Sequence, residues 1–117
     1  MRKENKMTQQ HPVHVLAQLR IEDKETFMEH YIKPLQRINS RHEVEVVSAS
    51  FDIDVIEGDA HHNMTAILKF PSRQVFDAWY ADDEYQPLIK IRKRLSDPKT
   101  ASLICINPGM EVQQDAN

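Results

Sequence analysis

Four stretches of this chain carry apolar residues at every second position, which is the repeat of a β-strand. They are found at about residues 13–21, 44–55, 64–70 and 101–106. After the first and third stretches, apolar residues instead recur every three or four positions, as on one face of an amphipathic helix. The order is therefore strand, helix, strand, strand, two short helices and strand. It predicts an α+β fold of the ferredoxin-like type, βαββ(αα)β, with a four-stranded antiparallel sheet.

Capping residues and prolines mark the limits of the expected helices. Asp23 is a good N-cap for a first helix over about residues 24–40, and Pro34 inside that helix predicts a kink one turn earlier. Ser72 is placed to cap the next helix. Asp82-Asp83 then ends that helix and begins another, which divides the second helical region in two.

The second strand is expected to be long and interrupted. Ser48-Ala49-Ser50 breaks the alternation, and Phe51, Ile53 and Val55 resume it. A β-bulge or a bend at the interrupting segment explains such a pattern. We therefore expect the strand to continue to about Val55.

The length and the charge of the chain limit its organisation. It has 117 residues, which suits one domain, and both ends are polar and aperiodic. We expect a disordered tail at residues 1–12, a single domain at 13–106 and a flexible tail at 107–117. The net charge of −3 does not favour nucleic acid, and no apolar run reaches the length of a membrane helix, so neither partner is expected.

The contents of cysteine, glycine and histidine bear on location and cofactors. The one cysteine, Cys105, excludes an intrachain disulfide and fits a cytoplasmic protein. With only two glycines, the chain has no Gly-rich loop for a phosphate group. Its six histidines include no helical pair with metal-ligand spacing, and no cysteine pair accompanies them. We expect neither a metal site nor a cofactor.

Apolar residues also occur on the opposite parity of the strands, for example Leu16, Ile67 and Ile104. A sheet with apolar groups on both faces needs cover on both. The chain supplies helices for only one face. We therefore expect a homodimer that packs the two open sheet faces together with two-fold symmetry.

Arg92 is the most unusual residue of the helical stripes. It follows Tyr85 by seven residues and precedes Leu95 by three, so it lies on an apolar face. A charge on that face needs a partner. One interpretation is an ion pair with Glu57 or Asp59 at the end of a strand. The other is a clamp for the carboxylate of a ligand, which the geometry of a guanidinium group suits.

Aromatic and acidic residues supply further candidates for a site. Trp79, Tyr80 and Tyr85 have the helical spacing of core residues. Core residues also line pockets, so these three are candidates for ligand binding as well. Glu57 and Asp59 are either a pair of catalytic carboxylates or residues that form a turn.

His14 begins a polar row on the first strand, which continues at the same parity with Gln18 and Arg20. If this row faces the interior of the dimer, it forms a second candidate pocket for a ligand. If it faces solvent at the rim of the sheet, it has no such role.

The folded part of the chain resembles a short bacterial family known as domain of unknown function thirteen-thirty, within the dimeric α+β barrel superfamily. The matching segments are Asp23, Phe27 and Tyr31; Val55-Ile56-Glu57-Gly58-Asp59; Ile67-Leu68-Lys69-Phe70-Pro71-Ser72; Ala78-Trp79-Tyr80; Glu84-Tyr85; and Arg92. The resemblance implies the dimeric barrel fold over about residues 13–106 and no settled activity. Relatives in the wider superfamily include cofactor-free monooxygenases, isomerases and haem enzymes, whose motifs are not visible in this sequence.

Three functions are compatible with these residues. The first, which we favour, is a homodimeric barrel that binds a small anionic or aromatic organic ligand. The second is a cofactor-independent enzyme, monooxygenase- or isomerase-like, in which Arg92 orients the substrate and Glu57, Asp59 or a histidine acts as base. The third is a structural or assembly module in which Arg92 forms a closed salt bridge. An unpaired Arg92 beside an open cavity would support the first two functions, and a fully paired Arg92 the third.

Overall fold

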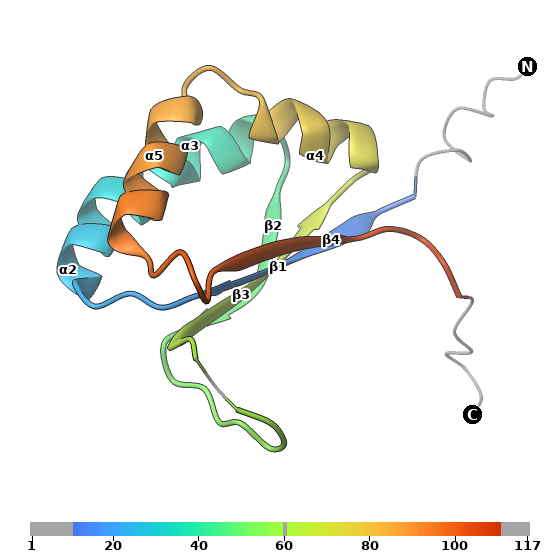
Figure 1. Cartoon of the computed structure of the whole chain (residues 1–117). Helices are drawn as coiled ribbons and strands as arrows, with labels where there is room; N and C mark the ends of the chain where they lie inside the picture. Colours follow the sequence, from blue (N-terminus) through green and yellow to red (C-terminus); the bar gives the residue numbers. More distant parts are fainter. Residues whose placement is uncertain (1–10, 60, 111–117) are drawn as a thin grey trace, which may run out of the picture.

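Four strands form one antiparallel sheet in the computed structural model, which describes residues 11–59 and 61–110. The strands are β1 (Val13–Leu19), β2 (Glu45–Ser50), β3 (Met64–Phe70) and β4 (Ser102–Ile106). Their order across the sheet is β2-β3-β1-β4, so β1 and β3 are central while β2 and β4 are the edges (Figure 1). The predicted ferredoxin-like α+β fold is confirmed. The predicted tails lie mostly outside the described residues.

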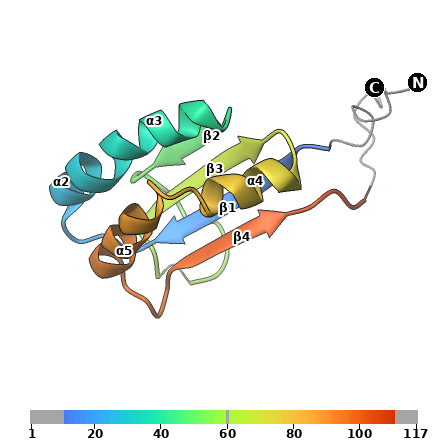
Figure 2. The same cartoon turned by 90° about the horizontal axis from the view of Figure 1, so that it is seen from above.

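The helices all lie on one face of this sheet (Figures 1 and 2). A continuous helical run follows β1, and two shorter helices lie between β3 and β4. They are α2 (Lys24–Phe27), η1 (Met28–Ile32), α3 (Lys33–Arg41), α4 (Arg73–Tyr80) and α5 (Gln86–Leu95). Over the described part of the chain, none of these helices combines the length and the apolar character that crossing a membrane requires.

Two of the predicted N-caps form as expected. The Asp23 carboxylate accepts a hydrogen bond of 3.1 Å from the backbone N–H of Thr26, and Ser72 Oγ accepts one of 3.2 Å from Val75. The break between α4 and α5 also falls at Asp82-Asp83. There the Asp82 side chain accepts from the backbone N–H of Glu84, so it shapes the connection and is not the N-cap of α5.

The first long helix contains a π-helical turn, η1, where the sequence predicted a kink. The backbone N–H of Lys33 donates to the carbonyl of Met28, five residues earlier. Pro34 is the second residue of α3, and in a regular α-helix its ring would clash with the carbonyl of His30. The wider turn relieves this clash without a break in the helix.

The second strand is shorter than the sequence predicted. It ends at Ser50, and its bulge lies between Val46 and Ser48. Continuation is not possible because β3, the partner strand, begins at Met64, and Ser50 already pairs with Thr65. The chain from residue 52 to residue 59, called the arm below, projects away from the sheet on the side opposite the helices (Figure 1).

The core lies between the sheet and the helices. Its largest fully buried side chains are aromatic and come from all parts of the chain: Phe27, Phe70, Trp79 and Tyr85. The ring centres of Trp79 and Tyr85 are 4.4 Å apart, and those of Phe70 and Trp79 are 5.0 Å apart. Burial of each such side chain contributes about 1.5–3 kcal/mol, so this aromatic group fixes α4 and α5 on the sheet.

Candidate functional site

A cavity of about 320 Å³, called the inner cavity below, lies between the helices and the sheet. Its floor consists of side chains from all four strands, and its walls are largely aromatic. Phe27 and Tyr31 come from the first helical run, Trp79 from α4, and Tyr85 from the turn before α5. A hollow of this size and apolar character suits a small organic ligand.

Three alanines side by side on the sheet make room for the inner cavity. Ala17 of β1 pairs with Ala66 of β3, and Ala66 pairs with Ala49 of β2. All three line the cavity floor. Since neighbouring strands lie about 4.8 Å apart, this row keeps a band across three strands free of large side chains.

Two tyrosine hydroxyls meet in the wall of the inner cavity. Tyr31 Oη and Tyr85 Oη are 2.6 Å apart and buried. Burial raises the pKa of both phenols, and the nearby charge of Arg92 offsets only part of that rise. Both groups are therefore neutral at physiological pH. One hydroxyl hydrogen serves the bond between them, and the other is available to an acceptor on a ligand.

Arg92 contributes a buried positive charge to the same cavity. Its exposed fraction is 7%, and its Nε atom is buried without a hydrogen-bond partner among the described residues. Over the same part of the chain, no carboxylate lies within ion-pair distance of the guanidinium group. A buried donor without a partner costs stability, and an anion in the cavity would supply the acceptor that Nε lacks.

The other polar side chains of the cavity wall are Trp79, Asn39 and Gln36. Trp79 Nε1 donates a 2.8 Å hydrogen bond to Asn39 Oδ1, and both residues are buried. Gln36 lines the cavity from α3, and its side chain is also exposed to solvent. The chemistry of the site is thus one unpaired guanidinium group, a neutral tyrosine pair and an aromatic enclosure.

The structure brings Trp79, Tyr85 and Arg92 together, as their helical spacing suggested. Tyr80 lies beside them, with its ring centre 6.0 Å from that of Tyr85. It does not line the inner cavity. It lines a smaller one of about 160 Å³ that shares Arg92 and lies toward β4.

The other candidates lie elsewhere. His14 is exposed on the face of the sheet opposite the helices, where it pairs in register with Lys69 and Ile106. Glu57 and Asp59 are exposed on the arm, and neither forms the hypothesised ion pair with Arg92. Within residues 11–59 and 61–110, no group of three or more metal-binding side chains comes together.

Sequence reasoning did not identify Tyr31, Asn39 or the alanine row as parts of a site. The helical spacing places Tyr31 on the apolar face of its helix, but the partner of its hydroxyl, Tyr85, lies 54 residues away in the sequence. The alanines have the parity of the helix-facing side. The sequence predicts that parity, whereas the alignment of the alanines across three strands depends on the register between the strands.

A family model described as a domain of unknown function, DUF1330, matches residues 12–106. This chain belongs to the DUF1330 family. The resemblance noted from the sequence is thereby confirmed. Comparison of this DUF1330 protein with curated proteins gives no match.

Several solved structures share the fold of this DUF1330 protein. A protein of unknown function from Rhodopseudomonas palustris matches with a TM-score of 0.70 at 20% identity, over 95% of this chain and 96% of that one. The N63A mutant of SnoaB, a cofactor-independent oxygenase from Streptomyces nogalater, gives 0.59 at 13% identity, over 88% and 98%. An ethyl tert-butyl ether d (EthD) family protein from Bacillus halodurans gives 0.57 at 16% identity, over 87% and 100%. Identities this low establish the fold and not the activity.

Proposed function

We propose that this DUF1330 protein binds a small organic anion with an aromatic or otherwise apolar body in the inner cavity. The observation that carries the proposal is the buried Arg92, which lines a mostly apolar hollow and whose Nε atom has no partner in the described structure. A ligand carboxylate would supply the missing partner, and the aromatic walls would enclose the rest of the ligand.

The structural alternative required Arg92 to be closed off by Glu57 or Asp59. Both carboxylates are exposed on the arm, so this explanation of the buried charge has no support. Burial of the Nε donor without a partner costs stability. An acceptor on a bound ligand would remove that cost.

The enzymatic alternative required a base within reach of the ligand. Among the described residues that line the inner cavity there is no histidine, aspartate, glutamate or lysine. The raised pKa of Tyr31 and of Tyr85 makes these phenols hydrogen-bond donors and not bases. The inner cavity therefore holds groups that bind and orient an anion, and binding is the function that it supports best.

The proposal includes a homodimer formed through the open face of the sheet. On this face Ile104 is 48% exposed and Ile106 is 55% exposed, beside Leu16 and Ile67 of the central strands. The arm projects on the same side and carries Ile56, which is 87% exposed (Figure 1). Apolar surface of this kind on a small domain is typical of an interface.

Binding of 2-naphthoate, compared with its neutral amide, tests the ligand site. Trp79 is the only tryptophan of the chain and lines the cavity, so quenching of its fluorescence reports occupancy of this site. We expect Arg92→Met to weaken 2-naphthoate about tenfold or more, because a hydrogen bond to a charged group contributes about 1.5–3 kcal/mol. The amide should bind wild type and variant alike.

The matched control is Arg94→Met, on the same helix but exposed. It should leave binding of 2-naphthoate unchanged. Without ligand, Arg92→Met should be as stable as wild type or more stable, because an unpaired buried charge is removed. Absence of 2-naphthoate binding by wild type would refute the proposed site, and loss of stability in Arg92→Met would contradict the unpaired state of this side chain.

A further inference from the structure

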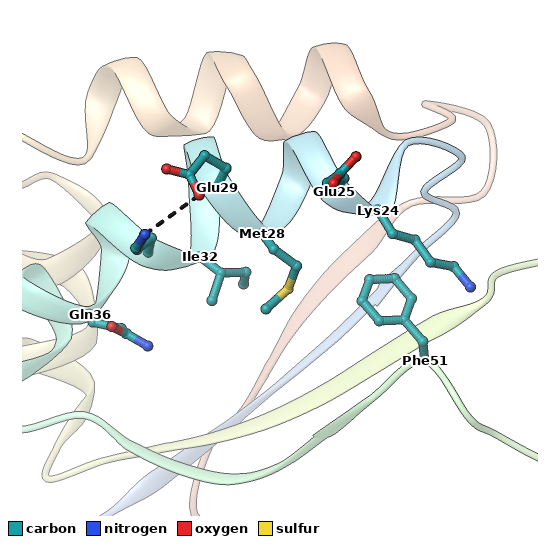
Figure 3. Close-up of a pocket in the computed structure, with 8 residues that line it drawn as sticks. Lys24, Glu25, Met28, Glu29, Ile32, Gln36 and Phe51 are labelled. Carbon is teal, nitrogen blue, oxygen red and sulfur yellow. Dashed lines mark ion pairs between the residues drawn. The ribbon is translucent and has the colours of Figure 1, made fainter.

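A surface groove of about 600 Å³ lies beside the inner cavity (Figure 3). It is bordered by the first helical run on one side and by Phe51, just after β2, on the other. Met28 and Ile32 point from the helix toward the strands, and the ring of Phe51 faces them across the groove (Figure 3). Met28 is 47% exposed, so the groove presents apolar side chains to solvent.

The groove and the inner cavity share part of their wall. Ile32 and Gln36 line both hollows. They are four residues apart, which places them one above the other on the same side of the helical run. The two hollows therefore meet at these side chains.

The edge strand β2 is uncovered at the same place. Val46 and Ala49 have the helix-facing parity and line the inner cavity, yet both are exposed. Their cross-strand neighbours on β3, Leu68 and Ala66, are buried. The helices thus cover β3 but leave β2 open, and the inner cavity has a mouth between the first helical run and β2.

Arg92 lies toward the other edge of the sheet. It lines both the inner cavity and the smaller cavity beside β4, together with Leu19 of β1 and Leu103 of β4. Since β2 and β4 are the opposite edges, three strand spacings of about 4.8 Å separate the two ends by roughly 14 Å. The cavity therefore has a charged end near β4 and an apolar mouth near β2.

Charged side chains border the groove without filling its centre. Lys24 Nζ lies 5.0 Å from the ring centre of Phe51, and Lys33 forms a 3.5 Å ion pair with Glu29. Met28, Ile32 and Phe51 supply the apolar part of the groove. An apolar chain that leaves the mouth would pass from buried aromatic walls to these side chains.

We infer that the ligand is an elongated amphipathic carboxylate, with its head at Arg92 and its tail in the surface groove. This inference rests on the proposed function, and it adds the class of ligand. A straight chain that reaches from Arg92 to the mouth has to span the separation of the two edge strands, about 14 Å. Longer chains place their ends between Met28 and Phe51.

Calorimetric titration with straight-chain carboxylates of six to twelve carbons tests the inference. In wild type, each added pair of methylenes should raise the affinity roughly tenfold, because burial of one methylene contributes about 0.8 kcal/mol. Ile32→Trp narrows the mouth, so it should weaken dodecanoate tenfold or more while hexanoate stays within about threefold. Ser40→Trp, on an exposed position of α3 that lines neither hollow, is the matched control and should bind like wild type.

The titration separates failure of the inference from failure of the proposed function. If hexanoate and dodecanoate bind equally well and Ile32→Trp changes neither, the inference is overturned. It is overturned as well if 2-naphthoate binds and no straight-chain carboxylate does, and in both cases the anion site at Arg92 stands. If 2-naphthoate also fails to bind, both the inference and the proposed function are refuted.

Discussion

Ala66 is the residue that most directly controls the volume of the inner cavity. It is buried in the central strand β3, between Ala17 and Ala49 in the row that forms the floor. We expect Ala66→Leu to fill the hollow, to raise the free energy of unfolding by about 1 kcal/mol, and to weaken 2-naphthoate at least tenfold. Urea denaturation followed by circular dichroism and titration with 2-naphthoate measure the two effects.

Ala78→Leu is the matched control for this substitution, because Ala78 is exposed on α4. It should change neither binding nor stability appreciably. If Ala66→Leu instead destabilises the protein by about 2 kcal/mol or more, other side chains already pack against the row of alanines, and the hollow does not exist in solution.

The residues of the site differ in how far the sequence predicts them. The helical period places Trp79, Tyr85 and Arg92 on buried faces, and these three do meet. The period does not say whether a carboxylate reaches Arg92, because the partner depends on where the arm lies. The alignment of Ala17 with Ala66 depends on strand register, which is a tertiary property.

Helix α3 is joined to the connection between α4 and α5 by a group of charged side chains. Asp82 accepts from His42 Nε2 at 2.7 Å and from Arg41 Nε at 3.2 Å, and it also accepts from the backbone N–H of Glu84. The hydrogen bond from His42, followed by that from Glu84, holds the pKa of the Asp82 carboxyl below the ordinary aspartate value. This aspartate therefore favours the folded state whenever it is ionised.

The sign of the pH dependence follows from the lowered pKa of Asp82. Its contribution to stability is complete at neutral pH and is lost as the pH falls below the ordinary aspartate value toward the folded one. We expect Asp82→Asn to lower the melting temperature by a few degrees at pH 7 and to converge with wild type in acid. Thermal unfolding between pH 7 and pH 3 measures this difference.

Asp83→Asn is the control for the charge change, because Asp83 is the exposed neighbour of Asp82. It should follow the wild-type profile. A constant difference between Asp82→Asn and wild type at every pH would show that shape, and not the ionised carboxylate, stabilises the connection.

Among the helices and strands, the sequence predicts features that depend on neighbouring residues, such as helix caps. It does not predict the end of a strand, which depends on residues far away in the chain. Asp23 and Ser72 cap their helices as predicted, because a cap depends on residues three positions away. Pro34 disturbs its helix as predicted, but a π-helical turn absorbs the strain. The end of β2 at Ser50 follows from its register with β3, in which Ser50 already pairs with Thr65, and no local pattern reveals that register.

The whole molecule has one covered and one open sheet face, and the sequence predicted this from apolar residues on both strand parities. The open face includes Leu16, Ile67, Ile104 and Ile106, with the arm on the same side. The first part of the arm, as far as Val55, was expected to continue a strand. A second copy that covers the open face would also receive the exposed Ile56.

Substitutions that introduce charges on the edge strand β4, at the open face of the sheet, test the dimer. We expect wild type to have twice the single-chain mass of 13.7 kDa at micromolar concentration, and Ile104→Lys with Ile106→Lys to give the single-chain mass. Two like charges that meet their symmetry mates in an apolar interface would be desolvated without partners. Sedimentation equilibrium measures both masses, and Gln74→Lys on the exposed surface of α4 is the control that should stay dimeric. A wild type of single-chain mass would rule out the dimer and leave the Arg92 site unaffected, since the described cavity lies within one chain.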